Sequence, residues 1–163
     1  MPFQLRYMTD ADVALLRTLA NVCPPLGLHS AFTYWVVSHF YGDYSLIAFD
    51  EAGEAAGYIM SITKRDEPDL LYVWQIGVLS KYRRKALARE LIEKLYNEKI
   101  AASKIKRLQV TIDSNNVASN RFFRAFAERH GAAMKPIGEA AIVDPIEGKS
   151  ETETLFEIQL PDL

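Results

Sequence analysis

A basic run between an apolar segment and a predicted helix is the part of the sequence whose spacing best suits chemistry. Four of the five residues from 81 to 85 are basic, and small residues follow at Ala86 and Ala88. A loop that leads into a helix presents unpaired backbone N–H groups and the positive end of the helix dipole, which together bind anions. We therefore interpret this loop as a candidate diphosphate site, the alternative being an ordinary solvated basic loop.

The overall charge indicates that any recognition of anions is local. The chain of 163 residues has 19 basic and 21 acidic residues, which gives a formal net charge of -2. Such a balance provides no protein-wide positive field to hold nucleic acid or an anionic membrane. No apolar run approaches the roughly 18 residues needed to cross a bilayer. We therefore predict neither a nucleic-acid partner nor a membrane partner.

The cysteine and histidine content argues against a metal or disulfide site. Cys23 has no second cysteine to pair with, and the three histidines, His29, His39 and His130, lie far apart in the sequence. Metal sites that can be identified from sequence have ligands at short, regular spacing. The first ten residues resemble neither a secretory leader nor a transit peptide. We predict no metal, a reducing compartment and a cytoplasmic location.

The hydrophobic pattern predicts a single α/β domain over residues 1–163. Thr9 and Ser30 are expected to cap the first two helices, and the second helix is apolar nearly all round, so we expect it to be buried or to line a pocket. One further strand is expected between the last helix and the last strand. The expected strands are 4–7, 44–49, 55–63, 70–79, 107–112 and 153–160, and the expected helices are 11–22, 31–40, 86–99 and 117–131, with a polar loop over 64–69.

Two motifs in this framework resemble the acyl-CoA signature of the GCN5-related N-acetyltransferase (GNAT) superfamily. The strand-to-helix pattern V-x-x-x-x-[R/Q]-x-x-G-x-[G/A] is matched from Val78 to Ala88, and the later pattern N-x-x-[A/S]-x-x-[L/F]-[Y/F] is matched from Asn116 to Phe123. The resemblance implies the GNAT fold, a central mixed and mostly antiparallel sheet of six to seven strands flanked by four helices. It also implies acetyl-CoA as the co-substrate.

A second set of matches resembles one branch of that superfamily, the diaminobutyrate acetyltransferases of ectoine biosynthesis. The matching segments are Cys23-Pro24-Pro25-Leu26, the helix from Ser30 to His39-Phe40, Val73-Trp74-Gln75 and the region from Asn116 to Ala132. The similarity runs from about residue 8 to residue 159. It implies acetyl transfer to a primary amine of a small diamino acid, with L-2,4-diaminobutyrate as the leading candidate. It also suggests a homodimer.

The sequence departs from that branch at the expected acceptor site. Gly27, His29 and Phe32 stand in a segment where the branch has an aspartate, an asparagine and a tyrosine, and Ser150 stands where it has a histidine. Sites that bind small polar substrates discriminate strongly through such contacts, so the acceptor could be another amine. Ala86 replaces a glycine of the cofactor loop, which is tolerable where the backbone is in the right-handed helical region.

The resemblance implies direct attack of the amine on the thioester. A bulge in the central strand is expected to leave a backbone N–H of Ile76, Gly77 or Val78 free to polarise the carbonyl. Phe123 replaces a tyrosine that serves many relatives as general acid, so we predict no dedicated acid on that helix. Cys23 is interpreted as a small buried residue rather than a nucleophile.

Two residues are candidates for the base that must deprotonate the amine. Glu153 is the first, because the resemblance places it at the acceptor end, although an exposed strand carboxylate is an equal alternative. His29 is the second, with a capping or surface histidine as the alternative. We expect Phe32, Trp74 and Glu153 to bind the amine substrate. The cofactor-binding residues are expected to be Ile76, Gly77, Val78, Arg83, Arg84, Lys85, Ala86, Leu87, Ala88, Asn116, Ser119 and Phe123.

Three alternatives stay open at this stage. The acceptor could be a polyamine, an aminoglycoside or a protein terminus, although the aromatic second helix favours a closed site over an open peptide cleft. The chain could be a non-catalytic acyl-CoA-binding module, which Ala86 and Phe123 would suit. Binding of nucleic acid through residues 81–85 is disfavoured by the balanced charge of the remainder.

Overall fold

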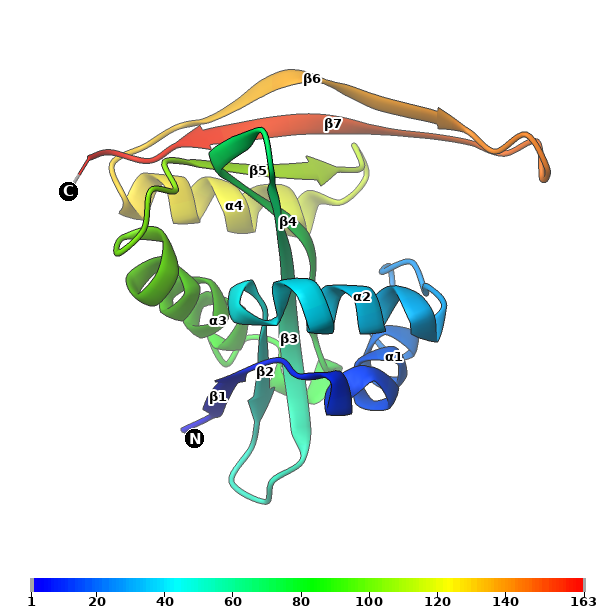
Figure 1. Ribbon diagram of the computed structural model, residues 1–163, viewed down its shortest axis with the longest axis vertical. Helices are drawn as coiled ribbons and strands as arrows, with labels where there is room; N and C mark the ends of the chain where they lie inside the picture. Colours follow the sequence, from blue (N-terminus) through cyan, green and yellow to red (C-terminus); the bar gives the residue numbers. More distant parts are fainter. Residues whose placement is uncertain (1, 163) are drawn as a thin grey trace.

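The computed structural model describes residues 2–162, in which a single seven-stranded sheet is flanked by four α-helices (Figure 1). This confirms the predicted fold class and order of elements. The elements are β1 (Gln4–Tyr7), α1 (Val13–Asn21), α2 (Ala31–Tyr41), β2 (Leu46–Phe49), β3 (Ala55–Lys64), β4 (Glu67–Val78), α3 (Leu87–Leu95), β5 (Arg107–Ile112), α4 (Val117–Arg129), β6 (Met134–Val143) and β7 (Ser150–Gln159).

The sheet has the strand order β1-β2-β3-β4-β5-β7-β6, and every neighbouring pair is antiparallel except β4 and β5. Its two faces carry separate cores. The larger core packs α3 and α4 against one face through residues such as Leu91 and Phe126. The smaller core packs α1 and α2 against the other face through Leu16 and Tyr34. Figure 1 shows α2 crossing in front of β3 and β4.

The centre of the sheet is forked between β4 and β5. The two strands pair in parallel only from Leu70 to Tyr72, opposite Arg107 to Gln109. The register of β4 against β3 shifts between Gln75 and Val73, so Trp74 is the extra residue of a β-bulge. A bulge bends its strand and interrupts regular pairing. Beyond Tyr72, β4 therefore pairs with β3 alone, and one edge of its backbone is left facing the fork.

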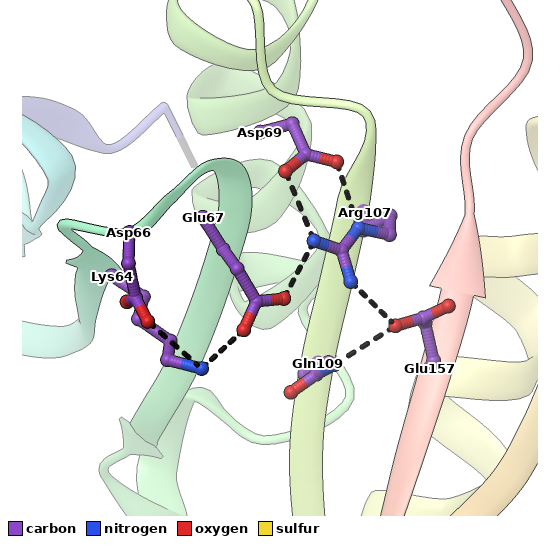
Figure 2. Close-up of polar contacts among 7 residues, drawn as sticks. All are labelled: Lys64, Asp66, Glu67, Asp69, Arg107, Gln109 and Glu157. Carbon is purple, nitrogen blue, oxygen red and sulfur yellow. Dashed lines mark hydrogen bonds and ion pairs between the residues drawn. The ribbon is translucent and has the colours of Figure 1, made fainter.

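An ionic cluster fixes the closed end of the fork (Figure 2). Arg107 on β5 donates to both carboxylate oxygens of Asp69, at 2.8 and 2.9 Å, and to Glu67 at 2.8 Å. On the other side it donates to Glu157 of β7 at 3.4 Å, and Gln109 donates to the same carboxylate at 2.8 Å. These bonds, Asp69 foremost, raise the pKa of Arg107. The cluster ties β4, β5 and β7 together where the fork begins.

The second helix differs from its prediction. Tyr34 and Val37 are buried against the sheet, but Phe32 and Phe40 are 70% and 62% exposed. Only one face of α2 reaches β3, so the remaining aromatic residues stack on one another instead, with the rings of Phe32 and Trp35 5.5 Å apart. The helix is therefore half-buried rather than enclosed.

Some predicted boundaries are also shifted. The third helix begins at Leu87 and ends as an α-helix at Leu95, followed by a wider π-helical turn over Tyr96–Ile100. The expected polar loop over 64–69 is a two-residue turn, because Lys64 ends β3 and Glu67 already begins β4. The last strand begins earlier than predicted, at Ser150, since β6 supplies it with a partner along its whole length.

Asp12 is predicted to contribute acid-sensitive stability. Its carboxylate is 3% exposed and accepts two hydrogen bonds from Arg6, at 2.7 and 2.8 Å, and one from the Thr9 backbone N–H at 2.8 Å. Burial alone would raise the pKa of Asp12, but the bonds from Arg6 and Thr9 lower it below its usual value. The contribution is therefore present above the unfolded pKa of about 3.9 and is lost as the pH falls through the lower folded pKa.

The variant Asp12→Asn is expected to lower the free energy of unfolding by about 1–3 kcal/mol at pH 7, since it weakens a buried charged hydrogen bond. The deficit should shrink below about pH 4, where the wild-type carboxyl also becomes neutral. Denaturant unfolding from pH 3 to pH 8 measures both effects, with the exposed Asp66→Asn as control. A deficit independent of pH would contradict this assignment.

Candidate active site

The open edge of β4 presents backbone N–H groups to the fork. The N–H of Leu79 donates to the carbonyl of Ala56 at 3.0 Å, which places residue 79 in a hydrogen-bonded pair with β3. Alternate residues of a strand point their N–H groups to the same side. Gly77 therefore faces β3, whereas Ile76 and Val78 face the fork, where β5 no longer pairs. Of the three predicted donors, Ile76 and Val78 have the required orientation.

The loop after β4 forms a cradle of free N–H groups at the start of α3. The first helical hydrogen bond runs from the N–H of Glu90 to the carbonyl of Ala86. Within residues 2–162, the N–H groups of Arg84, Ala86, Leu87 and Ala88 meet no acceptor. Arg84 and Ala86 both have positive φ, 69° and 59°. Consecutive turns of this kind aim backbone donors at a common point, and the helix dipole adds to their effect on an anion.

The backbone of Ala86 corrects one expectation. The residue was expected to be tolerable in the right-handed helical region, but it lies in the left-handed region with φ 59° and ψ 8°. A Cβ in that conformation approaches the following carbonyl oxygen. The tight entry into α3 imposes on alanine the conformation that a glycine adopts without strain.

Ala86→Gly is therefore predicted to stabilise the protein. Relief of the left-handed strain should exceed the entropy that glycine gains in the unfolded chain, which leaves a net gain of about 0.5–1 kcal/mol in the free energy of unfolding. The matched control is Ala88→Gly inside α3, which should cost about 0.5–1 kcal/mol. Denaturant unfolding of both variants is the measurement, and equal losses would contradict the strain at Ala86.

The basic side chains of the loop have different tasks. Within the described chain, none of the four forms an ion pair with an acidic side chain. Arg83 turns back to donate to the carbonyls of Val78, at 3.4 Å, and Pro24, at 3.2 Å. The ammonium groups of Lys81 and Lys85 lie 4.7 and 5.6 Å from the ring of Tyr82. The loop is thus positively charged and not neutralised from within.

The predicted motif residues of α4 are used inside the helix. The side-chain oxygen of Asn116 caps α4 by accepting the N–H of Ser119 at 3.1 Å. Phe123 is 2% exposed and belongs to the core on the α3–α4 face. These side chains position the start of α4, which follows the open end of β5.

The segment from Pro24 to Ser30 crosses β4 on the other face of the sheet. The side-chain amide of Gln75 donates to the carbonyl of Gly27 at 2.9 Å and accepts the hydroxyl of Tyr58 at 2.9 Å. A Cβ on Gly77 would lie 2.9 Å from Leu26 and 2.8 Å from the ring of Tyr58. Any larger residue at position 77 would therefore require Leu26 and the buried ring of Tyr58 to move.

His29 and Trp74 form an aromatic wall at the bulge. Their ring centroids are 5.2 Å apart, and the backbone N–H of His29 donates to the hydroxyl of Tyr34 at 3.3 Å. The predicted substrate residue Phe32 does not join this wall, because its ring is mostly exposed and stacks on Trp35. The structure brings together His29 and Trp74, which are 45 positions apart in the sequence.

Glu153 lies on the same face as this wall, with two hydroxyl groups that the sequence analysis missed. Val73 packs into the α3–α4 core, so its neighbours Tyr72 and Trp74 point to the opposite face. The hydroxyls of Tyr72 and Thr111 are 2.8 Å apart. Thr111 is paired with Leu155, which places Glu153, two residues before Leu155, on the Thr111 face of β7.

The environment of Tyr72 reflects this arrangement. Burial raises the pKa of Tyr72, the hydrogen bond with Thr111 partly opposes this shift, and the negative charge of Glu153 adds to it. The phenol thus stays protonated at neutral pH and is available as a hydrogen-bond donor. A pattern of alternating polar residues on three strands is the sequence signal that could have identified Tyr72 and Thr111, but it has meaning only once the strand register is known.

Cys23 is 2% exposed at the end of the α1 region, as predicted for a structural residue. Burial raises the pKa of its thiol, although the nearby charge of Arg83 opposes the shift. A buried thiol with a raised pKa is a poor nucleophile.

Residues 2–162 contain no group of three or more His, Cys, Asp or Glu side chains placed to hold a metal ion. No helix in this range is long and apolar enough to cross a membrane.

Known proteins resemble the chain over most of its length. Residues 14–127 match the model of the acetyltransferase (GNAT) family. The chain is 32% identical to the L-2,4-diaminobutyric acid acetyltransferase of Halomonas elongata over 157 residues, which cover 96% of this chain and 81% of the relative. It is 33% identical to the enzyme of that name from Streptomyces coelicolor over 150 residues, covering 91% and 87%.

A solved structure extends the comparison. The diaminobutyrate acetyltransferase of Paenibacillus lautus, in complex with L-2,4-diaminobutyric acid and coenzyme A, superposes with a TM-score of 0.88 at 27% identity. The match covers 98% of this chain and 95% of that one.

Proposed function

The chain belongs to the acetyltransferase (GNAT) family. We propose that it transfers the acetyl group of acetyl-CoA to a primary amine of L-2,4-diaminobutyrate or of a closely related diamino acid. The observation that carries the proposal is the fork in the sheet. The cradle of free N–H groups lies on one side of β4, and the wall of His29 and Trp74 lies on the other, on the face that carries Glu153. The diaminobutyrate acetyltransferases that resemble the chain over most of its length support this choice of acceptor.

The cradle fits a diphosphate. The free N–H groups of Arg84 and Ala86–Ala88 can donate to phosphate oxygens, and the four basic side chains of the loop supply compensating charge. Acetyl-CoA, when bound, supplies a thioester as the activated acyl group. Phe123, Asn116 and Ser119 then act by fixing α4 rather than by direct contact. The side chain of Arg83 acts by joining the cradle to the Pro24 turn.

The fork provides the donors for the reacting carbonyl. The N–H groups of Ile76 and Val78 face the gap between β4 and β5. Fixed donors that stabilise developing negative charge on a carbonyl oxygen contribute strongly to acyl transfer. Because they belong to a strand held by β3, they are oriented before the substrate arrives.

The acceptor side must bind an ammonium and remove its proton. An alkylammonium with a pKa of about 10 is neutral to only about one part in a thousand at pH 7. We assign Glu153 to accept that proton. The hydroxyls of Tyr72 and Thr111, which bond to each other, lie on the same face, and His29 and Trp74 form the wall. The amine nitrogen then bonds to the carbonyl carbon, the carbon–sulfur bond breaks, and sulfur departs as the thiolate. The nitrogen gives up its second proton to water or to the departing thiolate, which leaves a neutral amide.

The leaving thiolate has no tyrosine to protonate it at position 123. A thiol pKa of about 8 to 9 makes departure as an anion accessible at neutral pH, and water or the product ammonium can return the proton. The reaction thus needs no covalent intermediate on the protein, in keeping with the buried Cys23.

We further propose that the whole chain of 163 residues is one acetyltransferase domain that works as a cytoplasmic homodimer. The exposed aromatic residues Phe32 and Phe40 of α2 support an association surface. The single, unpaired Cys23 supports a reducing compartment.

A panel of amines tests the acceptor. Steady-state thiol release should give the highest kcat/KM with L-2,4-diaminobutyrate, followed by ornithine and lysine, and much lower values with polyamines, aminoglycosides and peptides. Good turnover of another amine without turnover of diaminobutyrate would overturn the acceptor assignment. The change of acceptor would then be attributed to the departures at Gly27, His29 and Ser150. Binding of acetyl-CoA without turnover of any amine would favour a non-catalytic module.

A further inference from the structure

Gln75 is a buried amide at the centre of the site. We propose that Gln75 is a specificity-determining positioning residue, which holds the segment 24–30, and with it His29, against Trp74 at the acceptor wall. The proposal rests on the acetyltransferase function proposed above. In it, Gln75 keeps the acceptor wall in place and does not touch the reacting atoms.

The orientation of the Gln75 amide is fixed by its two partners. The carbonyl of Gly27 can only accept a hydrogen bond, so the NH₂ group of Gln75 must face it, at 2.9 Å. The amide oxygen then faces the hydroxyl of Tyr58, also at 2.9 Å. Gln75 is 6% exposed and Tyr58 is fully buried. The bond to Tyr58 is therefore shielded from water, and the bond to Gly27 is part-buried, at the edge of the exposed segment.

The bulge makes this contact possible. In a regular strand Trp74 and Gln75 would point to opposite faces. The extra residue at position 74 lets Gln75 pair with Met60 while Val73 pairs with Ser61, so Trp74 and Gln75 both face the α1–α2 side. One of the two neighbours contacts the ring of His29, and the other holds the backbone two residues before it.

Other contacts hold the two ends of the segment. Arg83 donates to the carbonyl of Pro24 and the N–H of His29 donates to Tyr34, while Ser30 caps α2. Gln75 supplies the polar bond in the middle, at Gly27. Loss of the amide should therefore leave the segment attached to the fold but let His29 move relative to Trp74.

Kinetics of Gln75→Met test the proposal, since methionine keeps the length of the side chain and removes both hydrogen bonds. We expect KM for diaminobutyrate to rise about 10-fold or more, consistent with the loss of one to two hydrogen bonds. The affinity for acetyl-CoA should stay within about 2-fold, and the preference for diaminobutyrate over ornithine should fall. The matched control is Gln109→Met on β5, which removes an amide bonded to Glu157 away from the segment. A merely structural role would lower kcat for all acceptors alike.

A double-mutant cycle with His29→Ala checks that Gln75 acts through His29. The double variant should be no worse than His29→Ala alone, because the positioned group is already gone. Additive losses, or an unchanged KM in Gln75→Met, would overturn the proposal. If the methionine variant does not fold, Gln75→Glu keeps the size and the acceptor for Tyr58 while removing the donor to Gly27.

Hydrogen exchange provides a readout that does not depend on catalysis. Amide exchange in residues 24–30 should be faster in Gln75→Met than in wild type or in Gln109→Met. Unchanged exchange would overturn the positioning role even in an active enzyme. A wild type without turnover would instead overturn the proposed function, so the two failures are distinguishable.

Discussion

Replacing Glu153 with glutamine is expected to lower kcat for diaminobutyrate about 100-fold or more at pH 7. Glutamine keeps the shape of the side chain but cannot accept a proton, and general-base catalysis typically contributes 10²–10⁴-fold. The deficit should shrink as the pH rises toward 10, because the fraction of neutral amine then grows about tenfold per pH unit. Steady-state rates between pH 6 and pH 10 measure both effects.

The neighbouring Glu151 provides the control for this experiment. It lies two residues away on β7, is exposed and pairs with Ile142 of β6 near the end of the hairpin. Glu151→Gln should retain kcat within about 2-fold, as surface changes usually do. A wild-type rate in Glu153→Gln would identify Glu153 as an ordinary strand carboxylate and leave His29 as the candidate base.

Placing a carboxylate in the anion cradle should strongly weaken the binding of acetyl-CoA. Ala88 is the second residue of α3, and its N–H is one of the free donors. In Ala88→Glu the new charge would lie a few ångströms from a bound diphosphate, where repulsion between unit charges is about 4 kcal/mol at an effective dielectric constant of 20. We expect the affinity for acetyl-CoA to fall about 100-fold or more.

The same substitution away from the cradle separates this effect from general damage. Ala102 is exposed in the turn after α3, so Ala102→Glu adds the same charge at a distant position. Calorimetry should find an unchanged affinity in that variant. Equal affinities in Ala88→Glu and wild type would show that the diphosphate does not bind at residues 84–88.

The sequence predicts the elements well where hydrophobic periodicity and caps agree. Ser30 caps α2 as predicted, and the order of strands and helices follows the pattern. Thr9, the other predicted cap, precedes a short 3-10 turn over Asp10–Asp12, and α1 begins only after Asp12. The prediction fails at α2, because an all-apolar helix does not reveal how much of its surface the sheet can cover. Phe32 and Phe40 remain exposed for that reason.

The active site depends on register, which periodicity does not supply. Trp74 and Gln75 share a face only because of the bulge. Tyr72 meets Thr111 only because β5, which is far from β4 in the sequence, pairs with it in the sheet. The left-handed backbone of Ala86 is likewise set by the entry into α3 and contradicts the local preference of alanine. The sequence therefore locates the cradle but not the Tyr72–Thr111 pair on the face that carries Glu153.

Tracing the acetyl group itself tests the central claim most directly. The protein is incubated with acetyl-CoA that carries an isotopically labelled acetyl group and with L-2,4-diaminobutyrate, and the label is followed by mass spectrometry while thiol release is measured. We predict one labelled acetamide on the diamino acid for each thiol released, with no label on the protein. If the label stays on coenzyme A although acetyl-CoA and diaminobutyrate are both present, or if it accumulates on Cys23, direct transfer to the amine is contradicted.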